Sequence, residues 1–245
     1  MHKLPDIAEV IKMRKLSALS RIPDDLLQWM VSYIPGPLGN HLRCSYWKKH
    51  LKHLGSRVTI DVGACFQNPQ HITLDDDCWI DRNVLILAGA PQLERITYTL
   101  ENPDFKLRVG EVYIGKCTHI APNCVLSGIG GLYIGRNSGV ASNSAIYSFS
   151  HHYRDLTDRT STWQYSFTPR AHKDLQSMVL GPVHIGDYCA VGLNAVVLPG
   201  ASLQKGVWVG SGSVISGRHD GQQVVSSSSS LASKSLKNLT IKEHP

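Results

Sequence analysis

Aliphatic residues recur at every sixth position along much of the chain. From residue 183 the sequence reads VHIGDYCAVGLNAVVLPGASLQKGVWVGSGSVISG, in which six branched aliphatics follow this spacing without a slip. An α-helix repeats every 3.6 residues and a strand every two, so a period of six predicts a short strand, a corner and a restart. The predicted inward residues are Ile60, Phe66, Leu74, Ile80, Ile86, Ile114, Ile120, Leu126, Ile134, Val140, Ile146, Ile185, Val191, Val197, Leu203, Val209 and Ile215.

Three such sides close a triangular coil of about eighteen residues, and each coil stacks on the next. A second inward position lies two residues before each aliphatic and must be small, because it is close to a corner. Gly often follows the aliphatic, and the Asn, Gly and Asp residues around it suit tight corners and positive φ. The predicted small positions are Cys78, Val84, Thr118, Cys124, Ser138, Ser144, Cys189, Ala195, Ala201, Val207 and Ser213.

The repeat divides the chain into three parts. It predicts an all-β parallel helix of about six coils over residues 58–217, preceded by a helical, basic segment at 1–57 and followed by a short extension at 218–245. Two long segments, 87–113 and 147–184, interrupt the repeat, and long loops in a compact domain are usually functional. The second is rich in His, aromatic and Arg residues, which suits either a sugar ligand or a contact arm between subunits.

The composition excludes several classes of protein. With 42% hydrophobic and 18% charged residues, the chain is neither disordered nor a coiled coil. No apolar stretch is long enough to span a membrane and the N-terminus has no secretory apolar region, so we expect a cytoplasmic protein. The six cysteines form no C-x-x-C pair, and no His is spaced to complete a zinc site. We therefore expect reduced thiols, with Cys78, Cys124 and Cys189 as small core residues.

The positive charge is concentrated at the N-terminus. Residues 1–57 contain ten Lys and Arg against four acidic residues, whereas residues 58–245 contain fifteen of each sign. A basic segment attracts anionic partners, and YWKKHLKH (Tyr46–His53) mixes aromatic and Lys side chains. We expect no nucleic-acid binding and at most a peripheral, salt-sensitive contact with the inner face of a membrane.

The six-residue repeat over residues 58–217 resembles that of the hexapeptide-repeat acyltransferases, which fold as left-handed parallel β-helices. The sequence AIYSFSHHYRD is similar to the S-H-x-Y motif of the sugar and polysaccharide O-acetyltransferases of this class. The resemblance implies that His151, five residues after an inward aliphatic, is the general base, with His152 as the alternative. A neutral imidazole can take the proton of a sugar hydroxyl while its oxygen attacks the thioester of acetyl-CoA.

The resemblance also implies a homotrimer, in which acetyl-CoA lies between adjacent prisms against the last coils. The corresponding cofactor positions are Gly192, Leu193, Gly210, Ser211, Ser216 and Gly217. The chain departs from the family after the last aliphatic, where a basic pair is common, and in its serine-rich tail, where G-N-P-A-K is common. The acceptor is expected to contact the long second loop at Tyr153, Trp163, Tyr165 and Arg170.

Three other functions remain open. The same base and groove would serve N-acetylation of a nucleotide-linked amino sugar. A γ-type carbonic anhydrase needs three His on a metal, two of them five apart on one coil, and no pair within the repeat has that spacing, so no metal is expected. A trimeric scaffold without catalysis would share the fold, but it would not need a histidine at position 151, five residues after an inward aliphatic.

Overall fold

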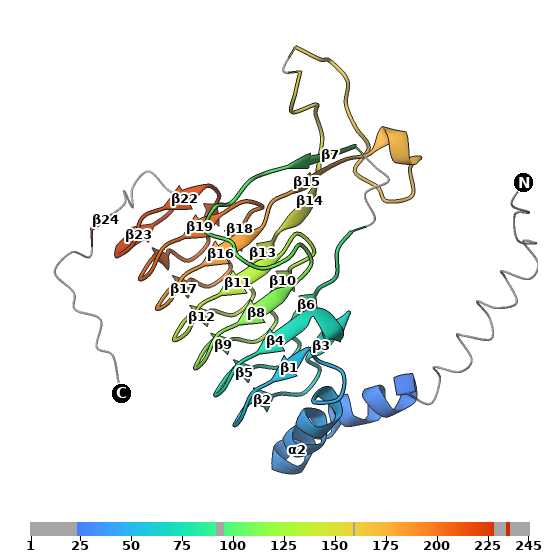
Figure 1. Ribbon diagram of the computed structural model, residues 1–245, viewed down its shortest axis with the longest axis vertical. Helices are drawn as coiled ribbons and strands as arrows, with labels where there is room; N and C mark the ends of the chain where they lie inside the picture. The colour runs from blue at the N-terminus through green and yellow to red at the C-terminus, as the bar shows by residue number, and fades with distance from the viewer. Residues whose placement is uncertain (1–23, 92–95, 159, 228–233, 236–245) are drawn as a thin grey trace, which may run out of the picture.

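The chain folds as a left-handed parallel β-helix, so the predicted fold is confirmed (Figure 1). The computed structural model describes residues 24–91, 96–158, 160–227 and 234–235. Three parallel sheets form the sides of a triangular prism, which has six complete coils and part of a seventh within these residues. Neighbouring strands within each sheet belong to successive coils, so the chain advances by one rung per turn.

We name the three sheets after the order in which the chain enters them. Sheet A contains β1 (His53–Leu54), β4 (Ile72–Leu74), β8 (Val112–Ile114), β11 (Leu132–Ile134), β16 (Val183–Ile185), β19 (Ser202–Leu203) and β22 (Arg218–His219). Sheet B contains β2 (Thr59–Ile60), β5 (Trp79–Ile80), β9 (His119–Ile120), β12 (Gly139–Val140), β17 (Ala190–Val191), β20 (Trp208–Val209), β23 (Gln223–Val225) and the antiparallel β24 (Lys234–Ser235). Sheet C contains β3 (Cys65–Gln67), β6 (Leu85–Leu87), β10 (Val125–Ser127), β13 (Ala145–Tyr147), β18 (Val196–Val197) and β21 (Val214–Ile215).

Every aliphatic of the six-residue repeat points into the prism. All seventeen predicted inward residues are buried, with at most 4% of the side chain exposed. The pairing is in register, so that Ile80 lies beside Ile120 and Val140 beside Val191. The core is therefore a set of aliphatic columns running along the prism, and each rung is covered only when the next coil is in place.

The small inward positions also hold the coils together. The Thr118 hydroxyl donates a hydrogen bond of 2.8 Å to the carbonyl of Gly135, and the Ser144 hydroxyl donates one of 2.7 Å to that of Gly192. The Cys189 thiol makes the equivalent 3.1 Å contact with the Gln204 carbonyl. Burial raises the pKa of Cys189 to about 11, so it remains a protonated donor at neutral pH. These side chains connect each coil to the next and are buried, as expected.

The corners use two different devices. Residues in the left-handed region of φ occupy equivalent corner positions in successive coils. The glycines that follow the aliphatics have a different role, which is to let two coils approach closely. A Cβ on Gly135, for example, would lie 2.6 Å from the backbone nitrogen of Asp187 in the next coil. These glycines do not adopt positive φ. The corner residues with positive φ include Asp77, Asn83, Asn123, Asn137, Asn143, Tyr188, Asn194, Gly206 and Gly212.

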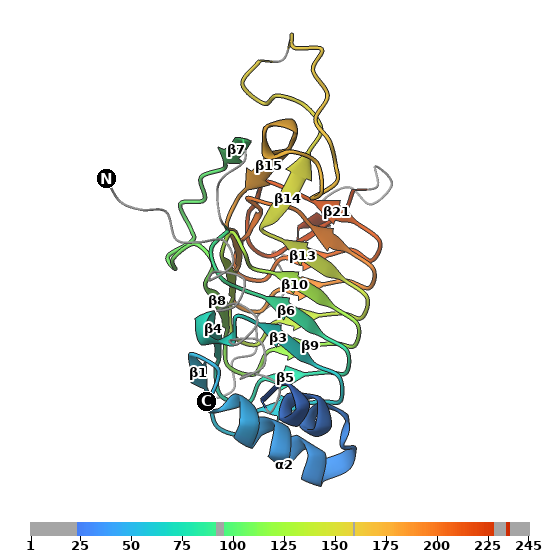
Figure 2. The same ribbon diagram turned by 90° about the vertical axis from the view of Figure 1, so that its right-hand side faces the viewer.

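Helices cover the N-terminal end of the prism (Figure 2). A helix over residues 24–33 is followed by α2 (Gly36–Trp47), and the buried Arg43 side chain donates to the carbonyls of Ile34 and Ile60. Trp47 packs edge-on against Phe66, with ring centroids 4.7 Å apart. Within the described ranges, no helix is long and apolar enough to cross a bilayer.

The two aromatic side chains of the Tyr46–His53 segment are buried and do not face solvent. Only 7% of Tyr46 and 1% of Trp47 is exposed, because both rings close the first coil. The sequence mixes aromatic and Lys residues here because the chain passes from the core to the surface, and Lys48 and Lys49 are exposed.

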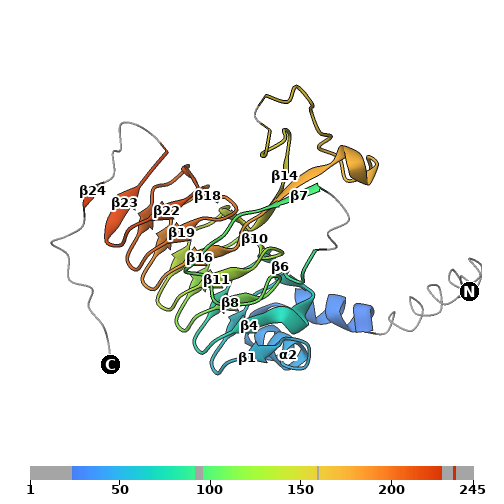
Figure 3. The same ribbon diagram turned by 45° about the horizontal axis from the view of Figure 1, so that its top comes forward.

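Both insertions leave the prism at one edge, where sheet C gives way to sheet A (Figure 3). We call it the C–A edge. The first insertion follows β6 and contributes β7 (Ile96–Thr99). The second follows β13 and begins and ends with β14 (Phe149–His152) and β15 (Ser177–Leu180), and a short η2 turn (Lys173–Leu175) precedes β15. The three strands form sheet D, with β15 antiparallel to β14 and parallel to β7.

The part of the first insertion that leads from β7 back to the prism is held on sheet A by side-chain hydrogen bonds. Asn102 donates hydrogen bonds of 2.9 and 3.1 Å to the carbonyls of Pro182 and Ala201. Asp104 accepts hydrogen bonds from Ser202 (2.6 Å) and Gln204 (3.0 Å) and pairs with Arg218. One insertion that starts at the second coil is thus fixed to the last coils.

Asp104→Asn should remove an acid-sensitive part of the stability. The Ser202 hydrogen bond, followed by Arg218, lowers the pKa of Asp104 below 3.8 in the folded state. The stability that the Asp104 carboxylate contributes is therefore complete when the pH is above the pKa of this group in the unfolded chain. It is lost as the pH falls through the lower pKa of the folded state. We expect the variant to lose about 1 kcal/mol at pH 7, and less in acid, in urea unfolding measured at several pH values. The exposed Asp220→Asn is the control, and parallel pH profiles for wild type and Asp104→Asn would contradict the assignment.

Candidate functional site

Sheet D carries both predicted catalytic histidines. His151 and His152 are consecutive in β14 and pair with Met178 and Ser177 of β15. Because side chains alternate along a strand, the two imidazoles point to opposite faces of sheet D. Only one of them can therefore face a given acceptor.

The two histidines have different surroundings. The half-buried His151 ring lies against Phe167 from the far side of the second insertion, with centroids 5.0 Å apart and planes tilted by 41°. The Nδ1 atom of His152 lies 2.8 Å from the carbonyl oxygen of Arg154, and its ring is next to Tyr153. His151 thus has an apolar cover, whereas His152 is oriented by the backbone that follows it.

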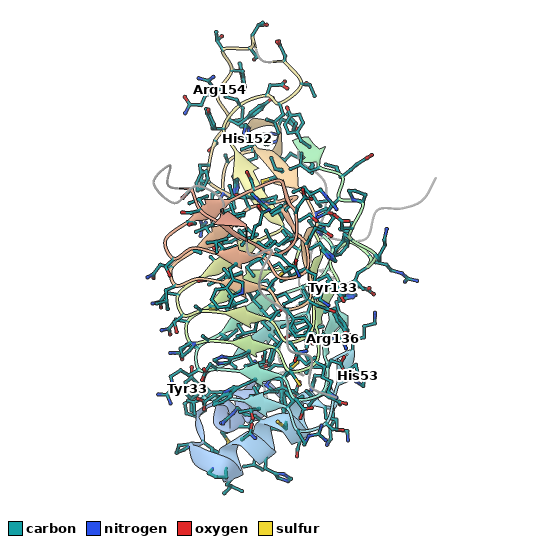
Figure 4. The ribbon with its side chains drawn as sticks, turned by 90° about the vertical axis from the view of Figure 1, so that its left-hand side faces the viewer. Tyr33, His53, Tyr133, Arg136, His152 and Arg154 are labelled. Carbon is teal, nitrogen blue, oxygen red and sulfur yellow. The ribbon has the colours of Figure 1, made fainter. Side chains whose placement is uncertain are left out.

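The predicted acceptor residues all lie in the projecting part of the second insertion, which we call the arm (residues 153–176; Figure 4). Tyr153 and Trp163 are more than half exposed, Arg170 is exposed and Tyr165 is half-buried. The backbone N–H of Tyr165 donates a 2.9 Å hydrogen bond to the Tyr153 carbonyl, which brings these two positions together.

One hydrogen bond fastens the arm to the first insertion. The Tyr98 hydroxyl on β7 donates to Asp155 over 2.8 Å, and Asp155 also accepts from the hydroxyl and backbone N–H of Thr157. The Thr157 hydrogen bonds, together with the one from Tyr98, hold the pKa of Asp155 well below its usual range. Burial, followed by the Asp155 hydrogen bond, raises the pKa of Tyr98. The base of the arm is thereby fixed directly after His152.

Four of the six predicted cofactor residues line a single groove. The groove has a volume of about 540 Å³ and runs over the outward face of sheet B to its edge with sheet C, the B–C edge. A Cβ on Gly139 would meet nothing within 4 Å, so the groove is open at its centre. It is lined by Gly192, Leu193, Gly210, Ser211, His119, Ala121, Gly139, Val140, Ala141, Ser142, Ala190, Val191, Trp208, Val209 and Val224.

The other two predicted cofactor residues lie elsewhere. Ser216 and Gly217 connect β21 to β22 and are therefore on the C–A edge, with the insertions. They are separated from the groove by the width of sheet C, so the structure does not bring all six residues to one place.

The groove and the histidines also lie on different edges. The groove reaches the B–C edge, whereas β14 leaves from the C–A edge. One chain therefore presents the two halves of the predicted site on opposite sides of sheet C.

Sequence reasoning missed the contacts of β14 and of the arm. Tyr98 of β7 contacts Asp155, 57 positions further along the chain, and Phe167 of the arm packs against His151. The alternating, β-branched ITYT segment at 96–99 was a signal for a strand, but not for its partner. Among the described residues, no group of three or more His, Cys, Asp or Glu side chains could hold a metal ion.

Comparison with known proteins supports the fold. No protein-family model matches the sequence. The structure is similar to AntD, an N-acyltransferase from Bacillus cereus in complex with dTDP and 3-hydroxybutyryl-CoA, with a TM-score of 0.56 and 15% identity over 79% of this chain and 84% of AntD. A mutant of AntD in complex with dTDP-4-amino-4,6-dideoxyglucose and coenzyme A gives a TM-score of 0.54 and 17% identity over 72% and 80% of the two chains. A maltose O-acetyltransferase from Clostridium difficile 630 matches with a TM-score of 0.44 and 16% identity over 85% and 82%.

Tyr98→Phe should loosen the arm. Loss of the hydrogen bond to Asp155 removes about 1.5 kcal/mol, enough to raise the open population of the arm by about tenfold. Limited trypsin digestion should therefore cleave the arm after Arg154, Arg170 or Lys173 several times faster. Tyr113→Phe removes a similar bond to Asp75 on sheet A and is the matched control. Equal cleavage rates for the two variants would show that Tyr98 does not hold the arm.

Proposed function

We propose that this protein is a CoA-dependent O-acetyltransferase that acetylates a hydroxyl of a sugar or polysaccharide precursor. One observation carries the proposal: both insertions of an otherwise regular prism meet in sheet D, which presents His151 beside an aromatic arm. Sugars bind to such surfaces through aromatic faces and hydrogen-bonding side chains, and Tyr153, Trp163, Tyr165 and Arg170 supply both.

His151 acts as the general base. Its neutral imidazole would take the proton of the acceptor hydroxyl as the oxygen attacks the thioester carbonyl. As the C–S bond breaks, the imidazolium would return that proton to the departing CoA thiolate, which leaves the acetyl ester, free CoA and the neutral base. Phe167 limits the access of water to one side of the ring, which favours proton transfer from the acceptor over hydrolysis. A backbone N–H of a neighbouring coil stabilises the developing oxyanion. His152 is the alternative base, since a donor bond from Nδ1 to the Arg154 carbonyl would leave Nε2 as the acceptor.

The groove on sheet B suits acetyl-CoA. Its volume is in the range of small-molecule sites, and its small residues leave a flat channel that an extended pantetheine arm can follow. Gly192, Leu193, Gly210 and Ser211 would line that arm, and acetyl-CoA supplies the activated acyl group when bound. Ser216 and Gly217 would contact it only from a second chain.

The separation of groove and base supports a trimer. The groove of one prism meets sheet D of the next, so that each complete site is built from two chains. A three-sided prism offers flat faces for such packing, and closed cyclic symmetry satisfies all three sites at once. The assembled enzyme would act in the cytoplasm.

N-acylation of a nucleotide-linked amino sugar is the second candidate. AntD, the similar structure with the dTDP-amino sugar, is an N-acyltransferase. A panel of nucleotide sugars, lipid-linked glycans and free sugars, incubated with acetyl-CoA, separates the candidates. Acetylation of amines alone would replace the proposal by the second candidate, and absence of both transfer and CoA binding would favour a scaffold.

His151→Ala should lower turnover by a factor of about 10² to 10⁴, because no side chain then takes the proton from the sugar hydroxyl. CoA affinity should be largely unchanged, since the groove is on another edge of the prism. His152→Ala is the matched control and should cost much less in the same steady-state assay. The reverse order would place the base at His152.

Gly139→Phe should block the groove without disturbing the fold. The new side chain would enter open space, so thermal unfolding should be unchanged, whereas CoA affinity should fall about tenfold or more. Isothermal titration with CoA measures this effect. Thr59→Phe places the same ring on sheet B three coils away and should leave CoA binding intact; equal losses in both variants would argue against the groove.

Sedimentation should give a mass of three times the 27.0 kDa chain. Because each site needs two chains, refolding a mixture of His151→Ala and Gly139→Phe should restore part of the activity that neither variant has alone. A fully active monomer, or a mixture no more active than its components, would contradict the shared site.

A further inference from the structure

The outward side chains of sheet A form a continuous column of stacked rings. Tyr113, Tyr133 and His184 occupy the same position on three successive strands, β8, β11 and β16. The centroids of neighbouring rings are 5.1 and 5.0 Å apart, and their planes differ by only 11° and 2°. Parallel strands about 4.8 Å apart therefore hold planar side chains at stacking distance when each strand supplies one.

The matching column on sheet B lacks two of its rings. Its outward residues on successive strands are, in register, Trp79, His119, Gly139, Ala190 and Trp208. The rings of Trp79 and His119 lie 5.2 Å apart, but the next two strands carry only a glycine and an alanine. The imidazole of His119 and the indole of Trp208 are thus separated by three strand spacings, or about 14 Å.

This gap has an oriented wall, an open floor and an uncovered aromatic face. The Nε2 atom of His119 lies 2.9 Å from Oδ2 of Asp81, which fixes the position of the imidazole. A Cβ on Gly139 would meet nothing within 4 Å. Trp208 is 57% exposed, and among the described residues no aromatic ring packs against its indole. The gap therefore has room for a planar group against either wall.

The gap is the middle of a trough that crosses the whole width of sheet B. Besides the groove of about 540 Å³ that reaches the B–C edge, a second hollow of about 580 Å³ reaches the A–B edge, where sheet A gives way to sheet B. Both are lined by Gly139, Ala190 and Trp208, so they are two ends of one trough. Tyr188 lines the A–B end, and Nζ of Lys205 lies 5.2 Å from the centroid of its ring.

We propose that the gap between His119 and Trp208 binds a nucleobase. A base is flat on both faces and stacks on aromatic side chains, whereas a sugar ring is puckered. Asn137 at one end of the trough and Ser142 at the other offer hydrogen bonds to the polar edge of the base. The choice of occupant rests on the proposed function, because acetyl-CoA and a nucleotide-linked acceptor each carry a base.

Isothermal titration of the full chain with AMP, dTMP, CoA and pantetheine tests the proposal. Trp208→Leu should lower the affinity for at least one of the three base-containing ligands by about tenfold or more, because the stacking face is lost. Pantetheine has no base, so its binding should not change. Trp79→Leu removes a similarly exposed indole from the same column, outside the gap, and is the matched control.

The probes also separate the two sources of the base. A loss for AMP and CoA assigns the base to the acyl donor, and a loss for dTMP alone assigns it to a nucleotide-linked acceptor. Trp emission gives a second readout: the bound nucleotide should quench it in wild type and in Trp79→Leu, and much less in Trp208→Leu. Ala190→Phe places a ring inside the gap and should abolish nucleotide binding without lowering the temperature of thermal unfolding.

Three results would overturn the proposal. They are the absence of binding by every base-containing ligand, equal affinities of wild type and Trp208→Leu, and a lower sedimentation mass of Trp208→Leu, which would assign the gap to a side chain of a second copy. Acetyl transfer that persists beside any of these results would leave the proposed function intact. Nucleotide binding that depends on Trp208, without any acetyl transfer, would contradict the proposed function alone.

Discussion

Stacking of one coil on the next is the interaction on which the rest of the structure depends. The aliphatic side chains of the three sheets form one continuous core, in which each rung lies beside the matching rungs of the neighbouring coils and the first coil is covered by Trp47 of α2. The hydroxyl and thiol groups of the small inward residues then donate to carbonyls of the following coil. Since both contacts repeat every coil, the chain must keep its register throughout the prism, and any extra residues must leave it at a corner.

Almost all of the irregularity is concentrated at the C–A edge. The A–B and B–C edges are closed by residues with positive φ at matching positions, and a side chain on Gly135 or Gly192 would collide with the next coil. These edges have little room for insertions. Both insertions depart from the C–A edge. In two other coils the repeat is lengthened at this edge by two residues, so that Leu74 follows Phe66, and Ile134 follows Leu126, after eight positions instead of six. The insertions that form sheet D and the arm are therefore all carried by one edge of an otherwise regular prism.

The sequence predicted the prism well because its determinants are local. A six-residue period in apolar residues is visible in any short window, and the small partner positions follow from the same register. The role of the glycines after the aliphatics was harder to predict from the sequence, since it depends on backbone atoms of the next coil. The pairing of β7 with β15 joins residues about eighty positions apart, and no pattern in either strand specifies the other. The burial of Tyr46 and Trp47 likewise depends on how α2 closes the first coil, which composition does not show.

A regular prism has flat sides and no natural cavity, which explains how its candidate site is divided. The groove exists because Gly139 and Ala190 interrupt the outward side chains of sheet B between His119 and Trp208. The repeat itself places one imidazole in that groove, that of His119, whose Nε2 lies 2.9 Å from Asp81 Oδ2. The proposed bases, His151 and His152, lie instead on a strand that has left the repeat at the C–A edge. The proposed donor groove and the proposed base thus lie on different edges of one chain, because insertions leave the repeat only where it can accommodate them, and apposition of two chains is the simplest way to bring them together.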